Sequence, residues 1–211
     1  MSKSGKPIVP AAAPQREYVE AFGEIVARIE RSIAAGPARA RRPVAMYVAG
    51  GAAQLFHTGA RVSEDIDASF SHRILLPDDL DVAYVDAGGV ARVLYFDRQY
   101  NETFALLHED VHADSQPLAI KGVDPTVIDV RVFAPVDLAV SKIARFAEHD
   151  QEDIRALARA GLITEGAVRR RAEEALDNYV GNLDRVRTSI DLAAELVRRN
   201  QKTKPARSRR G

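Results

Sequence analysis

Two aspartates separated by one residue are the feature of this chain best suited to chemistry. Asp65 and Asp67 flank an isoleucine in the segment AGGAAQLFHTGARVSEDIDASF, residues 49–70. On a strand, residues i and i+2 project from the same face about 7 Å apart, so these two carboxylates are expected to lie side by side. Magnesium prefers oxygen ligands and commonly binds one or two carboxylates plus substrate phosphates. The pair therefore predicts half of a site for Mg²⁺ or Mn²⁺.

A later strand pattern supplies a third carboxylate. In the segment TVIDVRV, residues 126–132, apolar residues alternate with Asp129 and Arg131. Adjacent strands lie about 4.8 Å apart, so Asp129 is expected to share a face with Asp65 and Asp67. Three carboxylates would hold two ions, one for the attacking oxygen and one for a triphosphate. An ion pair between Arg131 and Asp129 is the open alternative, and it would occupy the third carboxylate.

A glycine pair precedes the aspartates. Gly50 and Gly51 follow the apolar segment VAMYV and precede a helical pattern. Without β-carbons, their N–H groups are open to phosphate oxygens, and a helix N-terminus favours negative charge. Arg61 and Ser63 add a cation and a hydroxyl just before the aspartates. The segment predicts a phosphate-binding turn, with a plain turn as the alternative.

A lysine and two further acids occur in SKIARFAEHDQEDI, residues 141–154. On one continuous helix, Lys142 and Asp153 share a stripe but lie roughly 16 Å apart along the axis, which prevents a direct ion pair. Asp150 lies about 80° away from that stripe. We expect Lys142 to neutralise phosphate charge. The acids either orient it through other groups, cap the helix or form a solvated face.

Composition excludes several classes of protein. Thirty Lys and Arg residues balance thirty Asp and Glu residues, so the overall charge does not indicate a general nucleic-acid or membrane binder. The absence of cysteine excludes disulfides, thiolate zinc sites and a cysteine nucleophile. No apolar run reaches the roughly 18 residues of a membrane helix, and we expect a cytoplasmic protein. His57 and His108 lack partner spacing and are interpreted as ordinary helix or strand residues.

The periodicity of the chain predicts an α/β (α+β) protein. A sheet-bearing first half is expected to contain an amphipathic helix, a helix after the glycine pair and a mixed β-sheet. From Pro135 the pattern becomes helical, with one helix to about residue 161 and one or two more to residue 200. The expected elements of the first half are a helix at 18–33, a strand at 44–48, a Gly50-Gly51 turn leading into a helix that closes at Thr58-Gly59, and strands at 65–70, 80–86, 90–96, 104–108 and 126–132.

These elements suggest four parts of the chain. Residues 1–14 are expected to be a flexible N-terminus, 15–134 a core that includes the N-terminal helix, 135–200 a helical domain and 201–211 a basic disordered tail. The tail is either a solubilising end or a local contact to RNA, DNA or an acidic partner.

The segment VAGGAAQLFHTGARVSEDID resembles the first motif of the polymerase-beta-like nucleotidyltransferase superfamily. That motif is a hydrophobic residue, Gly-Gly or Gly-Ser, about a dozen residues and then Asp-x-Asp. Within the superfamily the chain is similar to AbiEii-type toxins of type IV toxin-antitoxin systems and to related nucleotidyltransferase-like proteins. The likeness rests on Arg61-Val62-Ser63-Glu64-Asp65-Ile66-Asp67 and on the segment with Lys142, Asp150 and Asp153, and covers about residues 44–160.

The resemblance implies a nucleotidyltransferase fold in which a mixed sheet is flanked by helices and followed by a C-terminal helical bundle. It implies metal-dependent transfer of an NMP from an NTP to a hydroxyl, with RNA such as the tRNA 3′ end, or a protein, as the acceptor. A cognate antitoxin is the implied partner, no membrane contact is expected, and an oligomer is an open possibility. The residues so assigned are Asp65, Asp67 and Asp129 as metal ligands and catalytic groups, Lys142 as a catalytic group, Gly50, Gly51, Arg61, Ser63 and Lys142 at the phosphates, and Asp150 and Asp153 in support.

Two alternatives come from other classes of function. An inert nucleotidyltransferase fold would act as a binding module, either for a nucleotide or for an antitoxin. A metal-dependent nuclease would use the same acids, although a hydrolase has no need of a triphosphate-binding turn.

Overall fold

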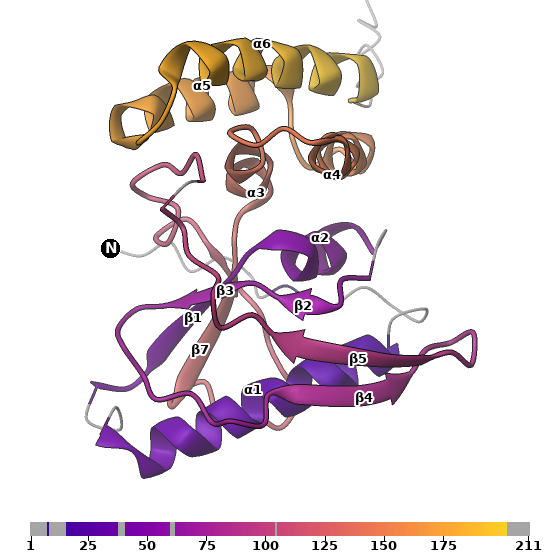
Figure 1. Cartoon of the computed structure of the whole chain (residues 1–211), viewed down its shortest axis with the longest axis vertical. Coiled ribbons are helices and arrows are strands. Elements are labelled where there is room, and N and C mark those ends of the chain that lie inside the picture. The colour runs from indigo at the N-terminus through magenta and orange to yellow at the C-terminus, as the bar shows by residue number, and fades with distance from the viewer. Residues whose placement is uncertain (1–7, 9–15, 38–40, 60–61, 104, 202–211) are drawn as a thin grey trace, which may run out of the picture.

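A computed structural model of the chain describes residues 8, 16–37, 41–59, 62–103 and 105–201. The strands are accompanied by helices on two sides, and Figure 1 shows α1 below them and the C-terminal helices above. In chain order the elements are α1 (Arg16–Ala35), β1 (Val44–Val48), α2 (Gly50–Thr58), β2 (Asp65–Ile66), β3 (Ala68–Phe70), β4 (Asp81–Val85), β5 (Ala91–Phe96), β6 (Gln116–Pro117), β7 (Ile128–Val132), α3 (Pro135–Ser141), α4 (Glu148–Arg159), α5 (Glu165–Ala175), η2 (Leu176–Asn178) and α6 (Leu183–Asn200).

The strands form two sheets with mixed directions. The first has the order β3-β1-β7-β6, in which β1 and β7 run parallel and both outer strands are antiparallel to their neighbours. The second has the order β2-β5-β4, with β2 parallel and β4 antiparallel to β5. The expected mixed α/β architecture with a C-terminal helical group is therefore confirmed.

The chain crosses from one sheet to the other at Asp67. Ile66 pairs with Phe96 of β5, whereas Ala68 pairs with Val48 of β1. The single strand expected over residues 65–70 is therefore wrong in extent. The alternation of apolar and polar residues predicted the two faces of this segment. The neighbouring strand changes from β5 to β1 in the middle of the segment, and no local sequence pattern encodes that change.

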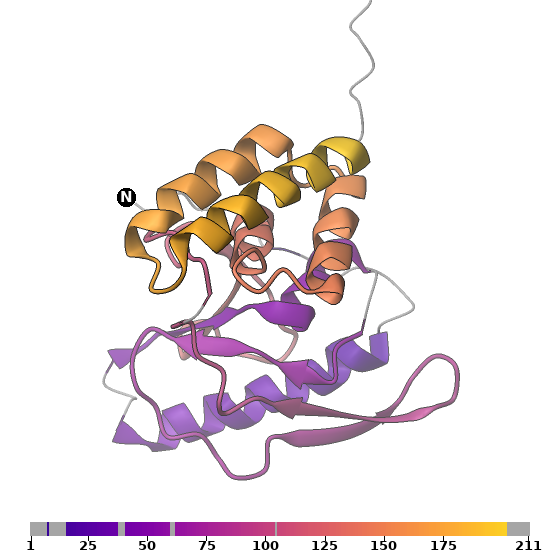
Figure 2. The same ribbon diagram turned by 45° about the horizontal axis from the view of Figure 1, so that its top comes forward.

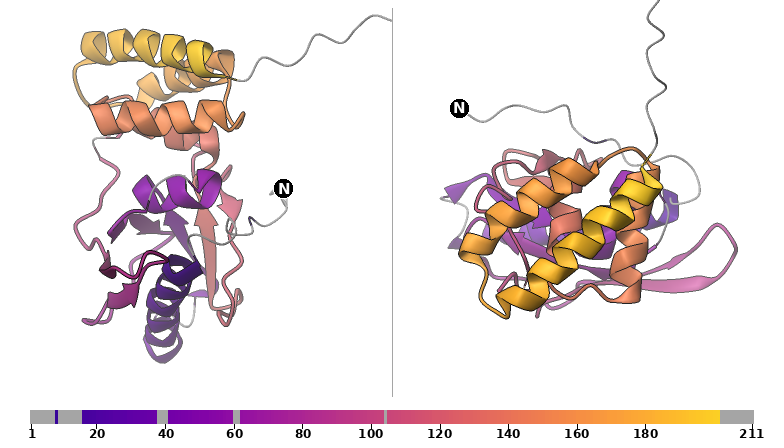
Figure 3. Two further views of the ribbon diagram at one scale, coloured as in Figure 1. Left: turned by 90° about the vertical axis from the view of Figure 1, so that its right-hand side faces the viewer. Right: turned by 90° about the horizontal axis from the view of Figure 1, so that it is seen from above.

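The helix α1 covers the sheets because its apolar residues follow the helical period. A buried stripe runs along the whole helix, and α1 contacts both β4 and β5. Figure 3 (left panel) shows α1 at the end of the molecule opposite the C-terminal helices. The expected helix over residues 18–33 is thus confirmed, with the buried residues Tyr18, Ala21, Phe22, Ile25, Val26, Ile29 and Ile33.

Several other local predictions are confirmed. VAMYV forms β1, and the helix α2 ends before Gly59, which adopts a left-handed conformation. The helix already includes Gly50 and Gly51, which were expected to form the turn before it. The hairpin β4–β5 and the strand β7 are also present. The strand expected over 104–108 is wrong, since residues 105–108 form none; residue 104 lies outside the described ranges. Burial of Leu106 accounts for its apolar character without strand pairing.

The helix expected from about residue 136 to 161 is broken in two. The first piece, α3, ends at Ser141, and α4 begins at Glu148. Between them Phe146 has a φ of 51°, a left-handed conformation that no helix interior contains. Neither glycine nor proline marks the break, so the sequence carries no local stop signal.

The last two helices pack side by side as a layer over α3 and α4, as Figure 2 and the right panel of Figure 3 show. The side chains of Thr164 and Asn182 cap the first turns of α5 and α6. Arg171 of α5 donates two hydrogen bonds to Asp137 of α3, at 2.7 and 3.1 Å. Asp137 is only 1% exposed, so this contact fixes α5 to the start of α3.

The two ends of the chain fall almost wholly outside the described residues. Of the expected flexible segment 1–14, only Ile8 is described, and its N–H donates to the carbonyl of Pro117. Of the expected tail 201–211, only Gln201 is described. The four-part division of the chain remains a prediction. Within the described ranges, no helix is long and apolar enough to cross a membrane.

We predict that Arg171→Ala lowers the free energy of unfolding by about 3 kcal/mol, because it leaves the buried Asp137 carboxylate without its partner. Urea unfolding followed by circular dichroism measures the change. Arg169→Ala is the matched control, since Arg169 lies on the same helix and pairs with Asp191 in the open. Equal stability of the two variants would contradict a role for the Arg171–Asp137 contact.

Candidate functional site

A cleft of about 550 Å³ lies where β1 ends, α2 begins and α3 gives way to α4. It is called the acid cleft below. Most of the residues expected to do chemistry line it, together with several that were not expected. The lining residues are Ala49, Gly50, Gly51, Ser63, Asp65, Asp67, Asp97, Tyr100, Asn101, Ala105, Ser141, Lys142, Arg145, His149 and Asp150.

Three aspartates line the acid cleft, and two of them are the expected pair. Asp65 belongs to β2 and Asp67 directly follows that strand. The third is Asp97, which directly follows β5 and whose N–H donates to the carbonyl of Ile66. Because β2 and β5 run parallel, both strands deliver their aspartates to the same edge of the sheet.

The negative charges of the acid cleft are not fully compensated. Burial raises the pKa of Asp67 to about 6, and the charges of Asp65 and Asp97 add to the rise. The positive charges of Lys142 and Arg145, across the cleft, favour the ionised carboxylate and limit this rise in the pKa of Asp67. The hydroxyl of Ser63 donates to Oδ1 of Asp65 at 2.5 Å, so Ser63 contacts an aspartate directly.

The carboxylates of the acid cleft are ligands of the kind that magnesium prefers, but by themselves they do not form a complete coordination site. Within residues 16–37, 41–59, 62–103 and 105–201, no three Asp, Glu or His side chains are grouped closely enough to hold a metal ion. Magnesium is commonly held by one or two carboxylates with substrate phosphates as further ligands. Burial is the main cause of the raised pKa of Asp67, and the neighbouring charges of Asp65 and Asp97, which a cation would offset, add to it. The residues therefore fit an ion that binds together with its substrate.

The glycine pair lies directly against the aspartates. Gly50 has a φ of 56°, and a β-carbon added there would lie 1.9 Å from Oδ2 of Asp67. The backbone N–H of Ala49 donates to the carbonyl of Asp67 at 2.9 Å. Gly51 is buried in the first turn of α2. Glycine at position 50 is thus required both by its conformation and by the close approach of Asp67.

The N-terminus of α2 opens into the acid cleft. Its N-cap residue is Ala49, which has no polar side chain to bind the first N–H groups. The helix macrodipole and these N–H groups together favour an anion. Gly50 and Gly51 both line the cleft, and the phosphate-binding role expected for them remains a prediction.

The structure brings Lys142 and Asp153 into direct contact, contrary to expectation. Nζ of Lys142 lies 2.7 Å from Oδ2 of Asp153, and both side chains are almost completely buried. The expected separation of about 16 Å assumed a continuous helix. The break around Phe146 folds α4 back towards α3, and this brings the two residues together. The amide of Gln54 in α2 also donates to the carbonyl of Asp153.

A second ion pair lies beside the first. Arg145 donates to both carboxylate oxygens of Asp150, at 2.8 and 2.7 Å. Burial disfavours the Asp150 carboxylate, but Arg145 and the N–H of Ala147 hold its pKa below the usual range. Asp150 thereby also caps α4, one of the roles expected for it. Arg145 is a cation of the acid cleft that sequence reasoning missed, because a continuous helix gave it no link to Asp150.

Asp129 does not join the other aspartates. It pairs in register with Ala45, four residues before Ala49, so it lies about 13 Å back along β1. It lines a different and mostly apolar pocket, and its Oδ2 accepts a hydrogen bond from Arg131 at 3.2 Å. The alternation predicted correctly which face of β7 carries Asp129. It did not predict how far along the sheet this residue lies from the other aspartates. The expected grouping of Asp65, Asp67 and Asp129 is therefore wrong, and the ion pair left open above is present.

Asp97 could have been found from a weaker signal. The segment VLYFD places buried Leu94 and Phe96 in alternation and ends in an acid, the same pattern that the chain shows at Asp65 and Asp67. What no pattern reveals is that β5 pairs with β2 and ends level with it.

Three further residues singled out in the sequence lie apart from the aspartates or outside the description: Arg61, His57 and His108. Arg61 lies outside the described residues. His57, in α2, contacts the carbonyl of Phe133 at 2.8 Å, and burial lowers its pKa. His108 lies 3.6 Å from Glu174 in α5 and belongs to no strand.

Residues 29–201 match a protein family described as nucleotidyltransferase of unknown function (DUF6036). The match covers most of the chain, so the chain belongs to this family and a nucleoside triphosphate is its implied substrate. No curated protein and no solved structure matches it.

We predict that Gly50→Ala lowers the free energy of unfolding by about 1–3 kcal/mol, because a side chain at this positive φ is strained. The new β-carbon would also displace Asp67. Thermal unfolding measures the effect.

Gly166→Ala is the control for that experiment. Gly166 lies in the first turn of α5, with nothing within 4 Å of an added β-carbon. It should keep or raise stability, by up to about 1 kcal/mol. A Gly50→Ala variant as stable as the Gly166→Ala variant would contradict the required close approach.

Proposed function

We propose that this member of a nucleotidyltransferase family transfers an NMP from an NTP to a hydroxyl group, with its chemistry in the acid cleft. One observation carries the proposal: Asp65, Asp67 and Asp97 line the same cleft as the Gly50-Gly51 turn and Lys142. Acidic ligands, a phosphate-binding helix N-terminus and cations in one cavity are what phosphoryl transfer requires.

The triphosphate would lie between two walls of opposite charge. The N-terminus of α2 and the cations Lys142 and Arg145 would bind its oxygens, while the aspartates face it from β2 and β5. Lys142 is held in place by Asp153 and Arg145 by Asp150, so both cations are oriented before the substrate arrives. Such preorganised charges stabilise a transition state without having to reorganise during the reaction.

Asp65, Asp67 and Asp97 are the residues that would hold Mg²⁺ or Mn²⁺. Bound there, the ion supplies charge neutralisation for the triphosphate and activation of the attacking oxygen. The acceptor hydroxyl forms a bond to the α-phosphorus, the bond from that phosphorus to the β-phosphate bridging oxygen breaks, and pyrophosphate leaves. The hydroxyl proton passes to solvent or to a carboxylate of the cleft.

The acceptor is proposed from the resemblance alone. The Gly-Gly and Arg-x-Ser-x-Asp-Ile-Asp motifs are shared with AbiEii-type toxins, which favours RNA such as the tRNA 3′ end, or a protein, as the acceptor. The same resemblance supports a toxin role with a cognate antitoxin. Incubation with each labelled NTP and either total RNA or protein distinguishes these acceptors by which one gains label.

We predict that Asp65→Asn, Asp67→Asn and Asp97→Asn each reduce label transfer from NTP at least about a hundredfold, since each removes a charge that would hold the ion. Chelation of divalent ions by EDTA should abolish transfer, and added Mg²⁺ should restore it.

Asp129→Asn is the matched control. It makes the same change on β7, a strand of the other sheet, at a residue paired with Arg131 and outside the acid cleft. It should keep activity within about twofold. Loss of transfer in Asp129→Asn with retention in Asp97→Asn would reverse the assignment. Labelled NTP that binds but never transfers, in any variant, would indicate an inert binding module.

We further predict that the stability and activity roles of Lys142 can be separated. Asp153→Ala should lower the free energy of unfolding by about 3 kcal/mol, because the ammonium stays buried without its carboxylate. The double variant Lys142→Met/Asp153→Leu should recover to within about 1 kcal/mol of the original protein. It should still lose transfer activity at least about a hundredfold, because the ammonium group that faces the phosphates is gone and only Arg145 remains on that wall. A stable and fully active double variant would exclude Lys142 from phosphate binding.

A further inference from the structure

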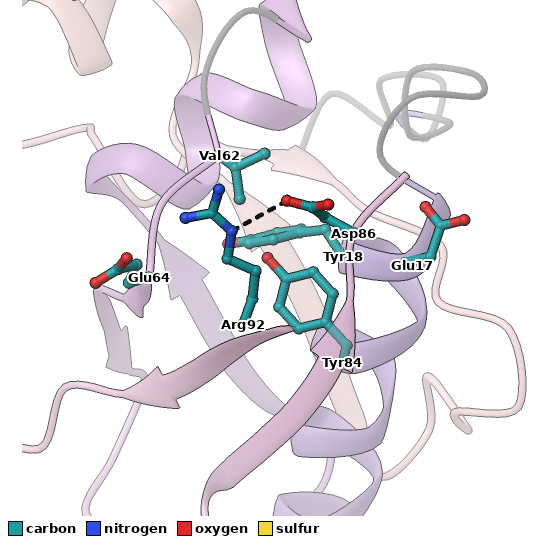
Figure 4. A pocket seen from close by; sticks show the side chains of 7 residues that line it. All are labelled: Glu17, Tyr18, Val62, Glu64, Tyr84, Asp86 and Arg92. Atoms are coloured by element: carbon teal, nitrogen blue, oxygen red, sulfur yellow. Dashed lines mark hydrogen bonds and ion pairs between the residues drawn. The ribbon is translucent and has the colours of Figure 1, made fainter. Parts of the chain in front are cut away.

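A second cavity, of about 150 Å³, lies on the α1 side of the sheet β2-β5-β4. It is called the tyrosine pocket below, and Figure 4 shows it. It shares no lining residue with the acid cleft, because alternate residues of one segment point in opposite directions. Val62 and Glu64 line the tyrosine pocket, whereas Ser63 and Asp65 line the acid cleft. The other residues of the pocket are Glu17, Tyr18, Tyr84, Asp86 and Arg92.

A buried hydroxyl in the tyrosine pocket has no partner. Tyr18 is 1% exposed, and among the described residues its hydroxyl makes no hydrogen bond. Oε2 of Glu17, at the same end of α1, is likewise buried without a hydrogen bond in that part of the chain. Buried polar groups are nearly always satisfied by protein, water or a ligand. Two such atoms beside one cavity indicate a polar occupant.

The charge of the pocket favours a cation. Asp86 is already engaged: Oδ1 accepts the N–H groups of Gly88 and Val90, and Oδ2 accepts Nε of Arg92. This pair closes the β4–β5 turn and forms a neutral wall. Arg92 is the one cation among the lining residues, so the carboxylates of Glu17 and Glu64 leave the lining with an excess of negative charge.

The walls favour an organic cation over a metal ion. Figure 4 shows Glu64 and Glu17 on opposite sides of the pocket, with Tyr84 and Arg92 between them, and the described residues contain no group of three acids that could hold a metal. The rings of Tyr18 and Tyr84 meet edge to face, with centroids 6.3 Å apart. Aromatic faces attract ammonium and guanidinium groups, whereas metal ions prefer several converging oxygens.

We propose that the tyrosine pocket binds a primary ammonium or guanidinium group of a ligand other than the NTP. The cation lies against the rings of Tyr18 and Tyr84 in a pocket flanked by Glu17 and Glu64, and the hydroxyl of Tyr18 accepts one of its N–H bonds. The cavity has room for one such group and part of its methylene stem. This site does not depend on the proposed transfer reaction, because its lining residues are separate.

Calorimetric titration of the full chain with n-butylguanidinium and with n-butylurea tests the proposal. The two probes have nearly the same shape and differ in charge. The cation should bind once per chain, at least about tenfold more tightly than the urea, and more weakly as salt is added. n-Butylammonium serves as the ammonium probe. Equal binding of butylguanidinium and butylurea would overturn the proposal.

Three variants locate the binding. Tyr18→Phe removes only the hydroxyl and Glu64→Gln only a charge, and each should weaken butylguanidinium binding at least about threefold. Glu20→Gln is the matched control, since Glu20 is an exposed acid of α1 outside the pocket, and it should leave binding unchanged. Melting curves show whether Tyr18→Phe is folded, and Glu64 is exposed, so its variant keeps the core intact. Unchanged binding in both pocket variants would overturn the assignment.

The source of the cation is tested with a blocked peptide, acetyl-Gly-Arg-Gly-amide. Binding of both butylguanidinium and the peptide would assign the pocket to an arginine side chain of a protein partner. Binding of butylguanidinium without the peptide would assign it to a small amine or guanidine compound. Both results support an organic-cation site.

Discussion

The contact between Gly50 and Asp67 is the constraint on which the acid cleft depends. It joins the end of β1 to the point where the chain passes from one sheet to the other, and the hydrogen bond from Ala49 to Asp67 fixes the two backbones at that distance. A side chain at position 50 would occupy the space of the Asp67 carboxylate. The N-terminus of α2 and the carboxylates therefore lie together only because this residue is glycine.

The two kinds of charge in the acid cleft are arranged differently. Burial, and after it the charges of Asp65 and Asp97, raise the pKa of Asp67, so this wall resists further negative charge. The cations on the other wall are each bound to an acid of α4, Lys142 to Asp153 and Arg145 to Asp150. Their acids neutralise the cations in the resting protein and hold them in position. The two cationic side chains are therefore ordered before a polyanion binds, and its binding costs little further side-chain entropy.

The sequence predicts what depends on neighbouring residues and fails where distant segments meet. The α1 stripe follows from the local period and was predicted correctly. The glycine pair and the two aspartates were also found from local patterns and line one cleft, where their roles remain predictions. Asp129 and Asp97 occupy equivalent patterns on two strands, and only the pairing of β5 with β2 decides which one reaches the cleft. The prediction that Lys142 and Asp153 lie too far apart to pair was wrong for the same reason. The helix is broken near Phe146, which has a left-handed conformation, and no glycine or proline marks that break in the sequence.

The two cavities depend on one short segment. Because side chains alternate along residues 62–65, the same backbone presents Ser63 and Asp65 to the acid cleft and Val62 and Glu64 to the tyrosine pocket. Burial and the neighbouring Tyr84 raise the pKa of the Tyr18 phenol, and the charges of Asp65 and Asp67 in the cleft add to the rise. A charge placed in the tyrosine pocket would therefore act on the aspartates through a single strand rather than through a long path.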